Sequence, residues 1–299
     1  MAVKVIHTEK ECVVKYDVNN PPDVIFDTNV WHGMNGADIA FLTGLQEKKR
    51  FRYRYTFTNF VELASHLADE SSKVCSNPFG KFKSCFRKIV QICHAEILPS
   101  PEMEFMTQAG LSHYVASAWR LDIEQIIPKV EGIANANSVA DLSRIIDVGH
   151  YLKLRHTDKE SFKAAFDDFP QISKPLRDSD IENSLQWFRY CIGFFFIERS
   201  SNGQVTYNEL SEEEKAGFQS ALATGVGRLF FNHCMTRIRQ TVRDGKKVDP
   251  NDLYDMLQLI LLRDNNRFFV TAEKSFFLYK LNDPESQKVV SWEQFRNSK

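Results

Sequence analysis

The sequence lacks the features that would place it in a membrane or in an oxidising compartment. Its longest apolar runs, 191–197 and 259–262, are far shorter than the roughly 20 residues that cross a bilayer. No apolar run follows the first four residues, so no signal peptide is expected. The six cysteines of the 299-residue chain form no Cys-x-x-Cys pair. These absences predict a soluble, cytoplasmic protein with reduced thiols and no membrane partner.

The chain also lacks an excess of either charge. Its 38 basic and 39 acidic residues leave a formal net charge of -1, which excludes a wholly basic surface but not local basic patches. Gly/Ser-rich linkers, low-complexity tracts and repeats of fixed period are absent as well, so nothing marks off an independent domain. Phenylalanine is abundant, with 24 residues, and this predicts a large aromatic core.

Strand and helix patterns alternate at both ends of the chain. Four short runs predict strands: 24–26, 54–57, 267–271 and 289–290. Helical patterns follow them at 38–48, from Thr58, at 274–281 and after Ser291. This alternation favours an α/β fold with a parallel sheet.

The middle of the chain, from about residue 72 to 248, has helical patterns only. Two capping-box patterns, at 179–182 and 211–214, mark helix starts, and the second opens a long apolar pattern that Gly245 is expected to end. The chain is therefore predicted to have three parts. These are an N-terminal extension (1–22), a discontinuous α/β domain (23–72 and 248–299) and an all-helical insertion packed on it (73–247).

Five carboxylates lie where predicted strands end or helices begin: Asp27, Glu62, Asp252, Asp255 and Glu273. Asp27 and Glu273 follow strands, and open parallel sheets bind ligands at the carboxyl ends of their strands. Glu62 lies one turn into its helix, and Asp252 and Asp255 lie one turn apart near a helix start. Each acid alone is explained more simply as a helix cap or a first-turn acid. Their joint order is what suggests a site.

The motifs around these acids resemble those of the PIN-domain nucleases. They read Val-Ile-Phe-Asp-Thr-Asn (24–29), Thr-Asn-Phe-Val-Glu-Leu (58–63), Asn-Asp-Leu-Tyr-Asp-Met (251–256) and Phe-Val-Thr-Ala-Glu-Lys (269–274). In that family the third and fourth acids are commonly 18 positions apart, as Asp255 and Glu273 are here. The chain departs from the family in two ways. Its fourth acid is Glu273 where Asp is usual, and the stretch from Glu62 to Asp255 is far longer than in minimal members.

The resemblance implies a PIN-like α/β/α sandwich with a central parallel sheet, interrupted by a large all-helical insertion. It also implies a metal-dependent ribonuclease, expected to be an endoribonuclease. Asp27 would be the central ligand of Mg²⁺ or Mn²⁺, Asp255 and Glu273 would complete the metal shell, and Glu62 would bind the metal directly or through water. Hard oxygen ligands suit these cations, and closely spaced carboxylates repel one another without them. The supporting residues would be Thr28, Asn29, Asp252 and Thr271.

The resemblance makes RNA the expected substrate, and local basic clusters are consistent with it. Candidate phosphate-binding residues are Lys48, Lys49, Arg50, Arg52, Arg243 and Lys246, and a further cluster lies at 81–88. The region 48–55 reads equally well as a strand with polar side chains outside and aromatic side chains inside. Charged helix ends are usually just solvated.

Two other functions stay open. One is a catalytically inactive PIN-like scaffold whose helical block binds a protein or RNA partner. The other is a nuclease that a protein partner regulates through the helical block. A phosphotransferase of the haloacid-dehalogenase type also has an Asp after its first strand. That class requires a second Asp two positions later, where this sequence has Asn29.

Overall fold

The computed structural model describes residues 2–8, 10–68, 77–93, 97–167, 192–193, 195–243, 252–277 and 284–298. Several predicted features lie outside these ranges: the capping pattern at 179–182, the helix end at Gly245, residues 278–281 of a predicted helix, and Lys246. The chain forms two compact units, which are described separately. The first comprises 1–100, 121–155 and 261–299, and the second comprises 101–120 and 156–260.

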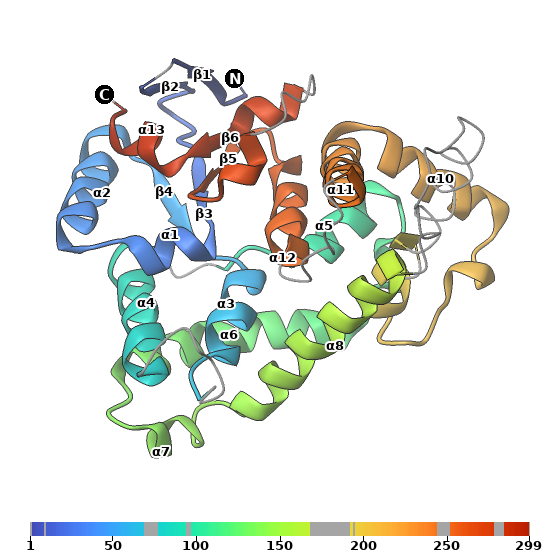
Figure 1. Cartoon of the computed structure of the whole chain (residues 1–299), viewed down its shortest axis with the longest axis horizontal. Coiled ribbons are helices and arrows are strands. Elements are labelled where there is room, and N and C mark those ends of the chain that lie inside the picture. The colour runs from blue at the N-terminus through green and yellow to red at the C-terminus, as the bar shows by residue number, and fades with distance from the viewer. Residues whose placement is uncertain are drawn as a thin grey trace. The chain divides into compact units, whose positions relative to one another are not determined.

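A four-stranded, all-parallel sheet forms the centre of the first unit (Figure 1). Its strands are β3 (Asp23–Phe26), β4 (Arg52–Arg54), β5 (Arg267–Thr271) and β6 (Val289–Ser291), in the order β4-β3-β5-β6. The predicted α/β class with a parallel sheet is therefore confirmed. Three of the strands lie within one residue of the predicted runs.

The exception is β4, which was predicted at 54–57 and ends at Arg54. The reason is a helix cap: the Thr56 hydroxyl accepts a hydrogen bond from the Asn59 N–H (3.0 Å), and the Asn59 side chain accepts one from the Thr56 N–H (3.2 Å). This reciprocal cap starts α3 (Phe57–Ser65) and stops the strand early.

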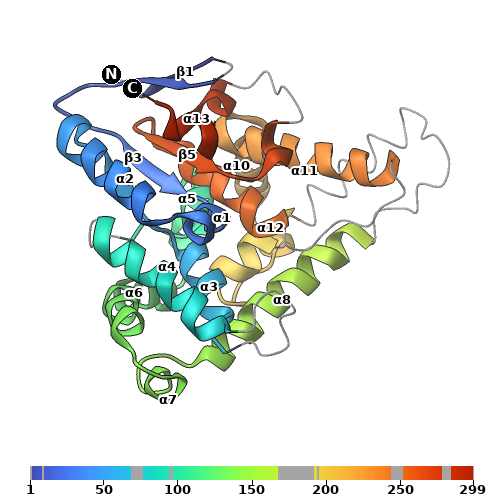
Figure 2. The ribbon, with the colours of Figure 1, turned by 60° about the vertical axis from the view of Figure 1, so that its left-hand side comes forward.

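The chain path reverses direction across the sheet at β3. From β3 it passes through α1 (Thr28–Gly33) and α2 (Gly36–Lys49) to β4 on one side. It returns much later to the other side of β3 as β5, and then continues outward to β6. In Figure 2, β3 and β5 run side by side. The switch point of the sheet therefore lies between β3 and β5.

Aromatic side chains fill the space beside the sheet, as the phenylalanine content predicts. Phe26 on β3 makes ring contacts with Trp31, Tyr53, Trp292 and Phe295, at centroid distances of 5.3 to 6.0 Å. The last two residues belong to α13 (Trp292–Arg296), which begins after Ser291 as predicted and whose first turn is capped by the Ser291 side chain. Such pairs add stability beyond the area that they bury.

The predicted N-terminal extension forms an ordered hairpin of β1 (Lys4–His7) and β2 (Cys12–Lys15). It lies beside α13 in both views (Figures 1 and 2). The Gln294 amide donates to the Thr8 carbonyl (2.8 Å), and His7 Nε2 lies 2.8 Å from the Gln287 carbonyl oxygen. The hairpin is thus attached to the last segment of the chain, within the same unit.

Helix α4 (Pro78–Ile92) carries the basic cluster at 81–88, and three of its cations bind helix-end carbonyls. Lys83 donates to the Ala136 carbonyl and Arg87 to the Ala134 carbonyl (3.1 Å), at the end of α6 (Ser117–Asn135). Lys88 donates to the Trp31 carbonyl of α1 (2.8 Å). Cations at helix C-termini bind unpaired carbonyls and oppose the helix dipole. These contacts give three of the basic residues a structural role.

The remaining elements of the first unit are short. They are α7 (Val139–Leu142), the first part of α8 (Val148–Asp167), and the 3₁₀ turns η4 (Lys274–Phe277) and η5 (Pro284–Lys288). The predicted helix at 274–281 is a 3₁₀ turn over the part that the structure describes.

The secondary-structure elements that the structure describes in the second unit are all α-helices or 3₁₀ turns. Its elements include α5 (Pro101–Gln108), η1 (Ser112–Tyr114), η2 (Tyr207–Glu209), α10 (Glu212–Ala223), α11 (Gly225–Arg243), α12 (Asp252–Leu257) and the start of η3 (Gln258–Arg263). Ser211 and Glu214 form the predicted capping box at the start of α10. The prediction of one long helix beyond it is wrong. The helix breaks at Thr224, and Gly225 follows with a positive φ of 50°, a conformation that glycine adopts without strain.

A buried ionic network joins four helical segments of the second unit. Arg199 lies 2.8 Å (Nε to Oε1) from Glu102 of α5 and forms a second ion pair with Asp158 of α8. The Tyr254 hydroxyl of α12 donates to the other Asp158 oxygen at 2.5 Å. Glu102 and Asp158 are only 2% and 4% exposed. Two carboxylates thus share one guanidinium away from water.

The two units do not follow the predicted domain boundaries. Residues 121–155, predicted to be insertion, belong to the unit that holds the sheet, and 252–260, predicted to be part of the α/β domain, belong to the other. Within the described part of the chain, no helix combines the length and the apolar character that spanning a bilayer requires.

Candidate functional site

Asp27 and Thr271 lie next to each other at the carboxyl edge of the sheet. Asp27 directly follows β3, and its N–H donates to the Val270 carbonyl (2.9 Å), which extends the ladder between β3 and β5 by one step. Thr271 is the last residue of β5. This is the switch point of the sheet, where open α/β sheets bind their ligands.

The Thr271 hydroxyl connects Asp27 to the turn that carries Glu273. It donates to Asp27 Oδ2 (2.7 Å) and accepts from the Glu273 N–H (2.9 Å). Because the Thr271 hydroxyl oxygen accepts the bond from the Glu273 N–H, its single proton is directed toward the Asp27 carboxylate. The Thr-x-Glu spacing of the sequence therefore produces a turn that orients Asp27.

A second hydroxyl holds Glu62. Thr28, the first residue of α1, donates to Glu62 Oε2 (2.6 Å) and accepts from the Asn59 amide (3.1 Å). Asn59 is completely buried and also closes the cap of α3. The sequence analysis did not select Asn59 as a site residue. In the sequence, the Thr-x-x-Asn pattern at 56–59 marks Asn59 as part of a helix cap. Its contact with Thr28 is visible only in three dimensions.

The charges of Glu62 and Glu273 act on the Asp27 carboxyl. Its pKa is raised to about 7, mainly by burial and then by these two charges, against the hydrogen bonds from Thr271 and Thr28, which lower it. Asp27 is fully buried, whereas Glu62 and Glu273 are partly exposed. Three acids from three elements thus share one electrostatic environment at the switch point.

Glu273 also acts as a helix-capping residue, which is the simpler role considered for it. Its Oε1 accepts from the Ser275 N–H (3.0 Å) at the start of η4, as a capping residue does. Asn29, predicted to support the site, is exposed on α1. It is not among the side chains that surround Asp27 in the contacts described above.

Asp252 and Asp255 lie on α12, in the second unit, and both are partly exposed. Within that unit, Asp252 adds to the effect of burial in raising the pKa of the Cys234 thiol. The role of these two acids in a site with Asp27 stays a prediction from the sequence.

The structure places most of the predicted phosphate-binding residues away from Asp27. Lys48, Lys49 and Arg50 end α2, and Arg52 begins β4 opposite Asp23, the first residue of β3. They therefore lie toward the amino edge of the sheet. Arg52 and Arg54 each approach Asp23 at 2.9 Å, in agreement with the structural interpretation of this strand.

The other two predicted substrate contacts cannot be placed. Arg243 ends α11, but its side chain lies outside the described residues, as does all of Lys246.

The donor chemistry of the cluster suits a divalent cation, but its present geometry does not form a metal site. Carboxylate and hydroxyl oxygens are the ligands that Mg²⁺ and Mn²⁺ prefer. Across the described residues, however, no group of three or more His, Cys, Asp or Glu side chains is arranged to hold a metal ion.

The Thr271 hydroxyl gives a direct test of this arrangement. Replacing Thr271 with Val is expected to lower the free energy of unfolding at pH 8 by about 1–3 kcal/mol, because the buried Asp27 carboxylate loses one of its hydrogen bonds and the Glu273 N–H loses its acceptor. The loss should be smaller at pH 5, where Asp27 holds a proton. Urea unfolding at both pH values measures it. Thr43→Val, at an exposed threonine of α2, should change stability by no more than about 0.5 kcal/mol. Equal effects of the two variants would contradict the role of Thr271.

Fold and site together define an α/β protein whose four-stranded parallel sheet carries interacting carboxylates at its switch point. Comparison of the chain with protein-family models, curated proteins and solved structures finds no match.

Proposed function

We propose that this protein is a metal-dependent ribonuclease of PIN-like α/β/α architecture, which hydrolyses RNA phosphodiester bonds at the carboxyl edge of its sheet. The observation that supports the proposal best is the meeting of Asp27, Glu62 and Glu273 at the switch point. Two buried hydroxyls, those of Thr271 and Thr28, bond to the first two acids. The motifs that carry the resemblance to PIN-domain nucleases contain the same residues.

The electrostatics of Asp27 favour the binding of a cation. A fully buried carboxyl whose pKa is raised by two neighbouring acids is costly to ionise, and a divalent cation would remove that cost. Asp27 would be the central ligand, with Glu62 and Glu273 beside it. When bound, Mg²⁺ or Mn²⁺ would lower the pKa of an attacking water and neutralise charge on the phosphate. The protein itself would hold Asp27 in place through Thr271, and Glu62 through Thr28.

A second function is supported by two observations. Glu273 already acts as a cap, and the described residues hold no ready-made metal site. Both fit a catalytically inactive scaffold whose helical part binds a protein or an RNA. In that case the acids at the switch point would have structural roles only, and the function would be to bind the protein or RNA partner.

Cleavage assays separate the two functions. Labelled single-stranded RNA and DNA are incubated with the full chain in Mg²⁺, Mn²⁺ or EDTA. We expect metal-dependent cleavage of RNA, and a loss of at least about 100-fold in Asp27→Asn, since removing a metal ligand costs several kcal/mol of transition-state stabilisation. Glu47→Gln, at an exposed acid of α2, should cleave as the wild type does.

Two results would favour the scaffold instead. One is the absence of both cleavage and Mn²⁺ binding in the wild type. The other is cleavage that Asp27→Asn retains in full, which would mean a contaminating nuclease. Glu273→Gln then tests that residue alone. Retained cleavage would limit it to its capping role, and lost cleavage would add it to the metal ligands.

A further inference from the structure

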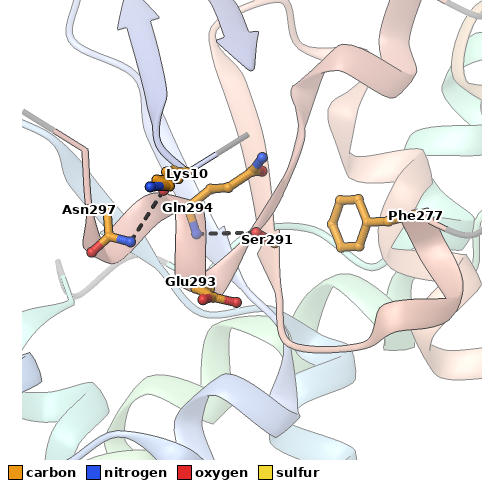
Figure 3. Close-up of a pocket in the computed structure, with 6 residues that line it drawn as sticks. All are labelled: Lys10, Phe277, Ser291, Glu293, Gln294 and Asn297. Carbon is orange, nitrogen blue, oxygen red and sulfur yellow. Dashed lines mark hydrogen bonds between the residues drawn. The ribbon is translucent and has the colours of Figure 1, made fainter. Parts of the chain in front are cut away.

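A cavity of about 490 Å³ lies beyond the end of β6, in the first unit (Figure 3). Its lining residues are Lys10, Phe277, Ser291, Glu293, Gln294 and Asn297. Cavities that bind small molecules range from about 300 to 1,000 Å³, so the volume suits a ligand of the size of one nucleotide.

The cavity lies in line with the candidate active site. Ser291 is the last residue of β6 and pairs with Thr271 of β5, which in turn bonds to Asp27. Neighbouring strands are about 4.8 Å apart, so Ser291 lies about 10 Å from Asp27 along the carboxyl edge. That is of the order of one to two nucleotides of an extended strand.

Phe277 supplies an aromatic surface to the cavity. It is the last residue of η4, four positions after Glu273, and its side chain is 40% exposed. Its neighbour Phe276 is buried and packs against Phe269 of β5 with centroids 5.8 Å apart. Phe276 therefore anchors the turn and leaves the Phe277 ring available for stacking. Unpaired bases stack on such rings whatever their identity.

The facing wall is polar and is held in place by hydrogen bonds. In Figure 3, Lys10, Gln294 and Asn297 lie on the side of Ser291 away from Phe277. The Asn297 amide donates to the Lys10 carbonyl (3.2 Å), and the Gln294 N–H donates to the Ser291 hydroxyl (3.1 Å). The turn of the N-terminal hairpin and α13 thus form one surface.

The charges of the lining favour a base with its phosphate over a free anion. One cation, Lys10, is balanced by one carboxylate, Glu293, so the cavity lacks the positive field that would concentrate inorganic phosphate. The Gln294 and Asn297 amides each donate one hydrogen bond within the protein, to the Thr8 and Lys10 carbonyls. The Glu293 carboxylate and the remaining donors and acceptors of these amides match those of a base edge. Guanine, with two donor groups on that edge, is the natural partner of Glu293.

We propose that this cavity binds one nucleotide of a single-stranded RNA, with the base stacked on Phe277 and hydrogen-bonded by the α13 side chains, and the phosphate near Lys10. The choice of RNA rests on the proposed ribonuclease function, whereas the recognition of a nucleotide rests on the cavity alone. The site would hold a nucleotide beside the one that is cleaved.

Isothermal titration of the full chain in EDTA with 5′-GMP, with inorganic phosphate and with a guanosine-containing RNA octamer tests the proposal without any cleavage. We expect saturable binding of GMP, tighter binding of the octamer and none of phosphate. Phe277→Ala should weaken GMP binding about ten-fold, the usual effect of removing a stacking ring. Leu152→Ala, on α8 and exposed to the same 40%, should leave it unchanged.

The results separate this inference from the proposed function. GMP binding that depends on Phe277, in a protein that cleaves nothing, would support the cavity and overturn the nuclease. Metal-dependent cleavage by a protein that does not bind GMP, or whose Phe277→Ala variant binds it as wild type does, would overturn the cavity and retain the nuclease. Binding of phosphate equal to that of GMP would also overturn the proposed recognition of the base. Binding of GMP but not of the octamer would identify free nucleotides as ligands and overturn the choice of RNA.

Discussion

At pH 8 in EDTA, the Asp27→Asn protein is expected to be more stable than the wild type by about 2–4 kcal/mol. The wild-type carboxyl is buried beside two other acids, and its pKa of about 7 in the folded state lies well above the ordinary value of 3.8. Ionised Asp27 therefore opposes folding, and a neutral amide removes that opposition. Asp27, which is proposed to bind a metal, would thus reduce the stability of the metal-free protein, as functional residues often do.

The contribution of Asp27 to the free energy of unfolding should change with pH. Between pH 4 and 7 folded Asp27 holds a proton that the unfolded chain releases, so its contribution to stability falls as the pH rises and is constant above pH 7. His32 acts in the opposite direction. Burial, with the charges of Lys81 and Lys88, lowers its pKa to about 4, so its contribution rises from pH 4 to 6.5. Comparing variant with wild type cancels the His32 contribution.

Urea unfolding of the wild type, Asp27→Asn and Glu47→Gln from pH 4 to 8 measures the difference. The gain in Asp27→Asn should disappear near pH 4, and Glu47→Gln should follow the wild type throughout. An Asp27→Asn protein that is no more stable than the wild type at pH 8 would show that the carboxylates do not burden the fold. A gain that persists unchanged at pH 4 would show that its cause is not ionisation.

Replacing Arg199 with Met should be the most damaging single change in the second unit, with a loss of about 3–5 kcal/mol at pH 7. Glu102 and Asp158 would remain buried without the guanidinium that lies against both. The Tyr254 hydroxyl bonds to only one Asp158 oxygen and cannot replace that charge.

Two comparisons identify the cause of the Arg199→Met effect. Lys215→Met removes an exposed pair with Glu212 and should cost no more than about 1 kcal/mol. Tyr254→Phe removes one hydrogen bond to a charged group and should cost about 1.5–3 kcal/mol. Thermal unfolding of the variants at pH 7 provides the measurement. A loss in Arg199→Met no larger than that in Lys215→Met would contradict the ionic role of Arg199 and limit it to packing against the Phe195 ring, which lies 5.6 Å from the guanidinium.

Three of the four strands of the sheet, β3, β5 and β6, could be predicted because each contains a short apolar run with clear ends. Residues 267–271 are an example, since the run is entirely buried in β5. The order of the strands could not be predicted, because nothing local in residues 23–26 shows that they pair with both 52–54 and 267–270. The errors at Thr56 and Gly225 also have local causes. In each, a helix cap or a left-handed residue outweighed the apolar pattern.

For the candidate site, the sequence identified acids that the fold brings together in the first unit, but not their hydrogen-bond partners. Asn59 was missed because its contact with Thr28 joins segments 31 positions apart. Arg52 was selected for its charge, and only the sheet register shows that it faces Asp23. Composition and spacing locate candidate groups, whereas their orientation depends on tertiary contacts.

The central position of β3 has a consequence for how the protein is made. Val24, Ile25 and Phe26 are completely buried, and their partner β5 is synthesised more than 200 residues later. At ribosomal rates of about 5–20 residues per second, one side of β3 waits about 10–40 s after β4 has emerged. During that time an apolar strand edge is unpaired, which is a template for aggregation. The strand that precedes Asp27 is thus a part of the nascent chain that a chaperone would have to protect until β5 is made.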